Sequence, residues 1–428
     1  MGPVMKKRDN DRRHKHLLEK NYLKTLITEI STRFDFNKRS WIAETIVKKL
    51  DVLVESFEES KRIKRLKPGE LLLPYKNKLL AIPLLDEEAL AIFVDTKVFA
   101  AYKKRIIKKT LQLLKNLDKK ANLNDVCSLI SPRDTIARYH QDADIYHCQI
   151  DACAPLINPE NLGIKISRKT PFITPIPEET KNDIIHFCVN EIGLKPFVAH
   201  SILKFFLEKR AYFLPLMDSI KPGQISWLAT SFKKSRKAGC VQIERQQVPV
   251  ILTLYTKQEL EKKPGNLKEL NAKMMRQLAR ITTEAYLQET LLPGDELQLF
   301  YLRSYSVIGK LLRKYMQINK VILPTPGTIL DAGTTLTHKE LVIDLHMKGY
   351  YTKEISKKTY HDPRSVDAYI KTFNSMLILW YFNLPASLIS MVTERGQKVV
   401  QQHLDIISKY FPDSSSVEDY LTKQEISL

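Results

Sequence analysis

Residues 349–373 read GYYTKEISKKTYHDPRSVDAYIKTF, and their spacing is that of two helices joined by a turn. Thr352 can cap the first helix, and Ile355 lies where that helix would face a core. Residues 359–362 have no helical apolar period and predict the turn. Pro363 then stands at the first position of the second helix, where its missing N–H costs nothing. The stretch therefore predicts a helix-turn-helix.

The second helix of this stretch has two faces. Its apolar residues repeat at helical spacing and predict a side that packs on a core, formed by Val366, Ala368 or Tyr369, and Ile370 or Phe373. Its other residues would point outward, and they are Arg364, Ser365, Asp367 and Lys371. In DNA-binding proteins of this motif class, outward residues in the first turns of the second helix read base edges. An ordinary helical hairpin has the same pattern, so this stretch alone leaves both interpretations open.

The pattern recurs upstream. Residues 295–315 predict two helices, the second capped by Ser304 or Ser306. Residues 321–324 and 328–330 read as two short strands around a Pro-Gly turn, and a hairpin in this place indicates a winged variant. The outward residues that we expect to contact DNA in this unit are Arg303, Ser306, Lys310 and Arg313.

The pattern also recurs downstream, where residues 384–392 and 397–407 predict two helices separated by Gly396. The expected DNA contacts of this third unit are Arg395, Gln397, Lys398 and Gln401. Residues 123–139 are a fourth candidate that carries Arg133 and Arg138, with a plain helical hairpin as the alternative. Recurrence in one chain favours the DNA-reading interpretation over unrelated hairpins.

The charge of the chain points the same way. It has 68 lysine and arginine residues against 48 aspartate and glutamate residues, a formal charge of +20 and a pI near 9.5, so its field attracts polyanions. The positive charge is clustered, and such runs suit phosphate contacts, which supply affinity but no sequence information. The clusters are residues 6–15, 61–67, 103–109, 119–120 and 233–237. We expect double-stranded DNA as the partner, with RNA binding or a purely structural scaffold as further alternatives.

Other features limit the class of protein. Five cysteines without a framework spacing predict a reducing, cytoplasmic location, associated with the nucleoid if the chain binds DNA. No apolar run approaches the roughly 18 residues that a membrane helix needs, so we expect no membrane partner. No glycine-rich phosphate loop occurs, and we expect no nucleotide cofactor. The sequence leaves an oligomer open.

The predicted fold class is mainly α and multidomain, with several helix-turn-helix units, one of them winged, and a small antiparallel β meander in the N-terminal part. The meander would use residues 70–75, 79–85 and 89–94, and residues 248–254 predict a further buried strand. The expected regions are a flexible basic arm (1–16), a basic helical region with the meander (17–120), a helical middle region (121–245), the winged region (246–331) and a tandem helix-turn-helix region (332–428).

Three kinds of chemistry were weighed against binding alone. A ribonuclease-H-type transposase needs three carboxylates around two metals; Asp95 follows an expected strand, and Asp86 and Asp344 also follow apolar runs. A tyrosine recombinase would need a set such as Arg303, His338, Arg364 and Tyr369, and zinc would need His140, His147, Cys148 and Cys153 at a spacing that fits poorly. We therefore assign no catalytic residue and no metal.

The C-terminal part of the chain carries a further pattern. Its features are the strand at 248–253, Arg280-Ile281 followed by Glu284-Ala285 and Gln288, Leu297 with Ser304 and Ile308, residues 327–339, and Val366 to Tyr369 before Phe373. Over about residues 247–410 the chain resembles an uncharacterised prokaryotic family that is defined as a domain of unknown function and is rich in helix-turn-helix elements. The resemblance implies site-specific DNA binding and an association with mobile elements or their regulation. The expected function is sequence-specific binding of double-stranded DNA, and the alternative is a transposase or recombinase with metal-dependent strand transfer.

Overall fold

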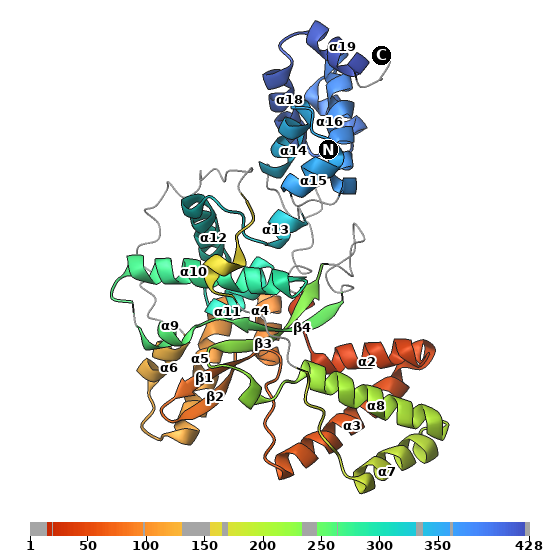
Figure 1. Ribbon diagram of the computed structural model, residues 1–428, viewed down its shortest axis with the longest axis vertical. Coiled ribbons are helices and arrows are strands. Elements are labelled where there is room, and N and C mark those ends of the chain that lie inside the picture. Colours follow the sequence, from red (N-terminus) through yellow and green to blue (C-terminus); the bar gives the residue numbers. More distant parts are fainter. Residues whose placement is uncertain are drawn as a thin grey trace. The chain divides into compact units, whose positions relative to one another are not determined.

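The computed structural model describes residues 15–18, 20–96, 99–130, 155–164, 170–232, 246–262, 264–330, 337–359 and 363–423. The chain divides into two compact units, one made of residues 1–147 and 158–315 and the other of residues 148–157 and 316–428. Most of the described residues are helical, and the described strands form one small sheet (Figure 1). The predicted fold class, mainly α with a small antiparallel sheet, is confirmed at this level.

The sheet belongs to the first unit. Its strands run in the order β2-β1-β3-β4, and all neighbours are antiparallel. β5 pairs with the end of β3 at Thr230 and Ser231, on the edge opposite β4. The strands are β1 (Glu70–Tyr75), β2 (Lys78–Pro83), β3 (Gln224–Ser231), β4 (Gln247–Thr253) and β5 (Thr290–Leu291). Strands from three of the expected regions (17–120, 121–245 and 246–331) therefore share one sheet. The division between the two units falls within helix α12 (Tyr305–Asn319).

The predicted third strand of the meander is wrong, because residues 89–94 lie in helix α4 (Glu87–Thr96). The Asp86 side chain accepts a hydrogen bond from the Ala89 N–H at 2.8 Å and caps the helix. The negative charges of Glu87 and Glu88 in the first turn interact favourably with the positive end of the helix dipole. The buried residues of this helix, Ala89, Leu90, Phe93 and Val94, have helical spacing rather than strand alternation.

Helix α10 (Leu267–Leu287) covers the free edge of β4. Gln288, directly after the helix, accepts from the Ile251 N–H at 3.2 Å and donates to the Ile251 C=O at 2.9 Å. Glu284 accepts from the Thr253 N–H at 2.6 Å, and Arg280 donates to the Thr253 C=O at 3.0 Å. Three side chains spaced four residues apart thus satisfy the edge backbone that a further strand would otherwise pair with.

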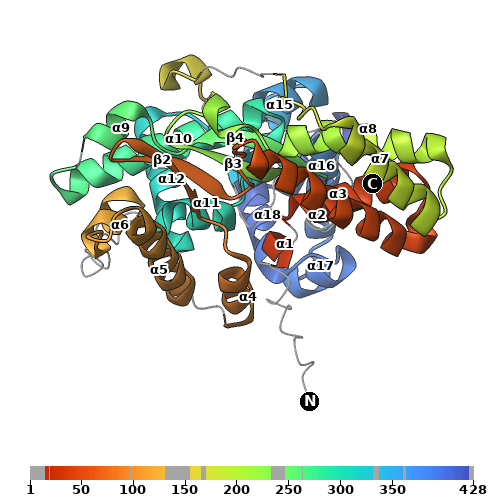
Figure 2. The same ribbon diagram turned by 90° about the horizontal axis from the view of Figure 1, so that it is seen from below.

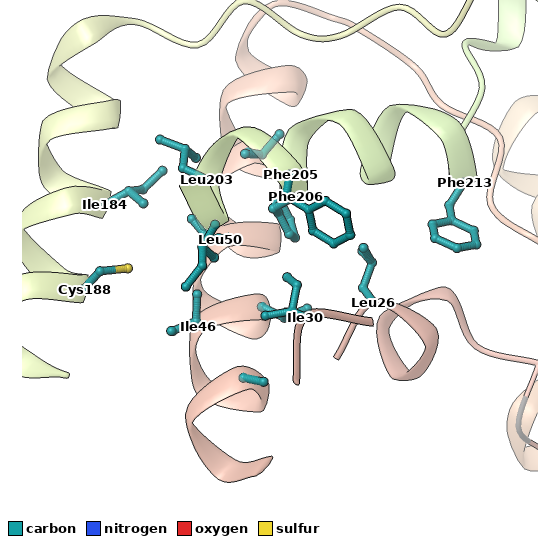
Figure 3. Close-up of a cluster of buried hydrophobic side chains, with 14 of the residues drawn as sticks. Leu26, Ile30, Ile46, Leu50, Ile184, Cys188, Leu203, Phe205, Phe206 and Phe213 are labelled. Atoms are coloured by element: carbon teal, nitrogen blue, oxygen red, sulfur yellow. The ribbon is translucent and has the colours of Figure 1, made fainter. Parts of the chain in front are cut away.

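Four helices pack together on another side of the first unit, as both views show (Figures 1 and 2). They are α2 (Tyr22–Arg33), α3 (Ser40–Ser60), α7 (Glu178–His186) and α8 (Pro196–Phe213). Figure 3 shows their shared core, in which Ile30, Leu50 and Phe206 are fully buried. Arg210 lies beside this core and bonds to Asp51 at 2.8 Å and to Glu58 at 2.6 Å, so its buried charge is compensated.

The remaining described helices of the first unit are short, apart from α5 and α12. They are α1 (Lys15–Leu18), α5 (Phe99–Leu117), α6 (Leu123–Leu129), α9 (Lys257–Glu261) and α11 (Gly294–Tyr301), with 3-10 turns at Asn37–Arg39, Pro159–Leu162 and Met217–Ser219 and a π turn at Phe187–Glu191.

The second unit is a helical bundle. Its helices are α13 (Pro326–Ile329), α14 (Thr337–Met347), α15 (Thr352–Thr359), α16 (Pro363–Tyr381), α17 (Ala386–Val392), α18 (Gln397–Tyr410) and α19 (Ser414–Lys423). One core joins the C-terminal half of α16 to α17, α18 and α19, and a separate small core lies between α14, α15 and the N-terminal half of α16.

The predicted wing is wrong. Residues 326–329 form the helical turn α13 instead of a strand, because Thr325 caps it through the Thr328 N–H at 3.3 Å and Pro326 occupies its first position. Ile322 makes a single parallel bridge, with Leu156, rather than a hairpin with residues 328–330. The Pro-Gly pair that suggested a hairpin turn therefore starts a helix.

Candidate nucleic-acid interface

Helices α14, α15 and α16 form a three-helix unit around its own core. Leu341, Val342 and Leu345 of α14 are buried against Ile355 of α15 and Val366 of α16. The two helices that the sequence predicted in residues 349–373 are present, and Ile355 and Val366 face the core as expected. Helix α14 precedes these two helices in the chain and packs against both through this core.

Local sequence explains how this unit is built. Gly349 follows the end of α14 and has a φ of +85°, a backbone conformation that favours glycine. The Glu354 carboxylate accepts from the Tyr351 N–H at 3.1 Å and fixes the start of α15. Pro363 opens α16. Together these residues set the lengths of the connections, and the shared core sets the packing.

The outer face of α16 carries the residues predicted to read DNA. Arg364, Ser365 and Lys371 are exposed, whereas Val366 in the same turns is fully buried. Asp367 is also exposed, but it accepts a hydrogen bond from the Thr352 hydroxyl at 2.8 Å. That bond ties α16 to the start of α15, so Asp367 has a positioning contact inside the unit.

Helix α15 adds exposed cations that the sequence analysis did not select. Lys353 and Lys357 are exposed one turn apart, and Lys358 lies over the Tyr350 ring at 4.8 Å from its centre. Tyr351, just before the helix, is 80% exposed. The spacing of four residues between Lys353 and Lys357 was the signal that could have identified this surface.

The C-terminal half of α16 is held by the larger core of the second unit. Phe373, Met376 and Leu377 are fully buried among residues of α17, α18 and α19. Tyr420 of α19 bonds to Asn374 at 3.0 Å and to His346 of α14 at 2.8 Å, and burial lowers the pKa of His346. This bracing fixes the helix whose first turns are exposed.

The downstream unit, α17 and α18, has the two predicted helices. Arg395 and Gln397 are exposed at the turn between them, and Gln401 donates to Asp405 at 3.0 Å on the same helix. Lys398 lies in α18, with its side chain outside the described residues. Both helices contribute to the core that holds α16, which gives them a structural role in addition to any surface role.

The upstream unit, α11 and α12, differs from the other two in burial. All residues from Asp295 to Tyr301 of α11 are buried, so this helix cannot lie across a DNA backbone in this state. Arg303 is half-buried, and burial lowers its pKa. Ser306 bonds to Ser304 at 3.2 Å. On α12, Lys310 is half-buried and Arg313 is exposed.

Two sets of predicted residues lie outside the described part of the chain. The first set is Arg133 and Arg138 of the fourth candidate unit, and the second is the possible zinc ligands, His140, His147, Cys148 and Cys153. The His338 side chain also lies outside the described residues, whereas Tyr369 packs against the small core of the three-helix unit.

The acids weighed for metal-dependent catalysis lie in separate surroundings. Asp95 belongs to helix α4, so the strand expected before it is absent. Asp86 caps that helix and is paired with Lys109 and Arg105. Asp344, on α14, accepts from Tyr410 and lies 3.3 Å from Lys409. Within the described residues, no three acidic, histidine or cysteine side chains group as a metal site.

The fold defines a mostly helical protein with one small antiparallel sheet and a three-helix unit in its C-terminal part. Residues 195–406 match the model of a family described as a protein of unknown function (DUF1670). The resemblance to an uncharacterised domain family is confirmed, and the match starts upstream of it, at the beginning of α8. No curated protein and no solved structure matches the chain. Among the described helices, none combines the length and apolar character needed to cross a bilayer.

Proposed function

We propose that the chain binds double-stranded DNA sequence-specifically through the unit of α14, α15 and α16. The observation that carries the proposal is the outer face of α16. Its outer face exposes Arg364 and Ser365 in the first turn and Lys371 in the third, while Val366 and Phe373 hold the helix to two cores behind them. A helix about 10–12 Å across fits the major groove, which is about 12 Å wide.

The neighbouring helix suits the backbone of the same DNA. In helix-turn-helix complexes the helix before the recognition helix crosses the sugar-phosphate backbone. Lys353 and Lys357 are exposed on α15, so two cations would meet phosphates. The Thr352–Asp367 hydrogen bond would keep α15 and α16 in register during this contact.

A role in the regulation or movement of a mobile element is the setting that the family resemblance suggests, and we propose it on that basis alone. Metal-dependent strand transfer would need a set of acids around the metals. Asp86 and Asp344 are each engaged by cations of their own unit, so no observation favours this alternative.

The test is selection of duplexes from a random pool by the full chain, followed by incubation of the selected duplex with Mg²⁺ or Mn²⁺. An enriched sequence that Arg364→Ala recognises poorly and Lys423→Ala recognises normally would support the proposal. Lys423 is a suitable control because it is an exposed cation on α19 of the same unit. Absence of any enriched sequence would contradict site-specific binding, and strand cleavage would favour the enzyme.

A further inference from the structure

Helix α5 of the first unit is unusually cationic. Its 19 residues, FAAYKKRIIKKTLQLLKNL, include no acid. Its cations are Lys103, Lys104, Arg105, Lys108, Lys109 and Lys115. One side of the helix is apolar and buried, with Tyr102, Ile106 and Leu114 fully inside. The helix lies away from α2, α3 and α8 in both views (Figures 1 and 2).

The structure sorts five of these six cations into two groups, and the sixth, Lys103, is half-buried. Arg105 and Lys109 lie on the flank of the helix and are paired with acids: both contact Asp86, and Arg105 also contacts Glu88. Their charges are therefore largely compensated within the unit. This flank contributes to folding, since Asp86 is buried and caps α4.

Lys104, Lys108 and Lys115 form the second group, which we call the α5 lysine stripe. All three are exposed, and within the described part of the chain no ion pair involves them. At 3.6 residues per turn they fall within about 40° of one another around the helix, opposite its buried side. They span roughly 17 Å along its axis at 1.5 Å per residue. The stripe is thus a straight row of uncompensated charge on a rigid element.

We propose that the α5 lysine stripe is a second DNA contact, which binds the phosphate backbone of duplex DNA without reading its sequence. Ammonium groups act as point charges and lack the planar fork that matches a guanine edge, so phosphate is their expected ligand. A row of roughly 17 Å is long enough for each of the three ammonium groups to meet a separate phosphate of the duplex, which carries one negative charge per about 1.7 Å of its axis. The inference rests on the proposed function, to which it adds a second surface.

The role of such a contact follows from the joining of two units in one chain. When one surface has bound, the other meets DNA at a high effective concentration, so weak contacts add affinity. The stripe would raise affinity for selected and unselected duplexes alike, because it carries no base readout. Base preference would remain with Arg364 of the second unit.

The test compares two full-chain triple variants on a random-sequence duplex and on the selected duplex. One is Lys104→Glu/Lys108→Glu/Lys115→Glu. The control, Lys195→Glu/Lys204→Glu/Lys221→Glu, makes the same charge change at exposed, scattered positions of the first unit. The stripe variant should flatten the slope of log affinity against log salt by about 2.7, or about 0.9 for each phosphate released, on both duplexes. The control should keep the wild-type slope.

Equal flattening in both variants would show an effect of net charge and overturn the proposal, as would an unchanged slope in the stripe variant. Binding of the wild type, but not of the stripe variant, to phosphatidylserine vesicles with no stripe effect on DNA would reassign the surface to a membrane. If the stripe variant folds poorly by circular dichroism, the Lys→Gln triple variant replaces it. Arg364→Ala separates the two proposals, because it should change only the preference for the selected duplex.

Discussion

Lys371 lies seven residues after Arg364 on α16, almost two helical turns, so both project from nearly the same exposed face. Its place in the third turn of the helix suits a phosphate rather than a base edge. Lys371→Ala should weaken binding to all duplexes alike and flatten the salt slope by about 0.9. Affinities at several salt concentrations check this, with Lys423→Ala as the control. A loss restricted to the selected sequence would instead assign Lys371 to base reading.

Glu296 shows a residue whose charge serves the fold. Its carboxylate is fully buried, lies 2.6 Å from Lys20 Nζ and accepts from the Trp227 indole N–H at 2.7 Å. Burial raises the pKa of Glu296, while the charge of Lys20 opposes the shift. The three groups tie the N-terminal segment, β3 and α11 together.

Glu296→Ala should therefore destabilise the chain by about 3–5 kcal/mol, because it leaves the buried Lys20 charge without its anionic partner. Only the neutral Leu228 C=O and Gln247 side chain would then accept its hydrogen bonds. Urea unfolding at neutral pH gives this value. The matched control is Glu44→Ala, which breaks an exposed pair with Lys48 on α3 and should cost well under about 1 kcal/mol. Similar losses in the two variants would mean that the buried pair contributes no more than a surface pair.

At the scale of elements, the structure of α10 explains a motif whose role the sequence alone did not show. Arg280, Glu284 and Gln288 were part of the family pattern, and the structure places all three on the edge of β4. Glu284 and Gln288, four residues apart, bond to Thr253 and Ile251, which are two residues apart on the strand. Arg280 bonds to the Thr253 C=O beside Glu284. The motif therefore protects a sheet edge, and no chemistry is needed to account for it.

Gln288→Ala should cost about 1–3 kcal/mol, because it leaves the Ile251 N–H and C=O with fewer hydrogen bonds at a partly buried edge. Glu261→Ala is the control, because Glu261 is the exposed last residue of α9, and this change should be nearly neutral. Thermal unfolding of both variants measures the difference. A neutral Gln288→Ala would mean that water replaces the side chain at this edge.

The same scale shows what the sequence could predict. Long amphipathic helices and the helices around Ile355 and Val366 were found because their apolar residues repeat locally. β3 was missed: it is buried along nearly its whole length and pairs with β1, β4 and β5, which are distant in sequence. Its sequence therefore shows no alternation of apolar and polar residues. No short turn links it to a neighbouring strand, so the sequence does not indicate its partners.

Two local errors had local causes. The apolar residues 89–94 predict a strand, although Asp86 and the acids after it mark the start of a helix. The Pro-Gly pair at 326–327 predicts a hairpin turn, although Thr325 and Thr328 form a capping box. For the candidate interface, the sequence pattern predicted Arg364 and Lys371 as outward residues. It did not select Lys353 and Lys357 of α15, because they lie on a short polar helix.

At the scale of the whole molecule, charge governs binding strength. With a formal charge of +20 on the chain, several phosphates should be neutralised on binding. Log affinity for any duplex should fall linearly with log salt, at about −0.9 per phosphate contacted. Titrations from low to physiological salt measure the slope. A flat response would contradict electrostatic binding, whatever the role of α16.

The central claim is that the exposed first turns of α16 read bases, and Arg364 tests it most directly. The measurement is the ratio of affinities for the selected duplex and a scrambled duplex, at one salt concentration, in the wild type and in Arg364→Ala. We predict that the variant reduces this ratio by a factor equivalent to about 1–3 kcal/mol, through weaker binding of the selected duplex at one base pair. An unchanged ratio in a folded variant would contradict the claim and make the three-helix unit a structural or protein-docking element.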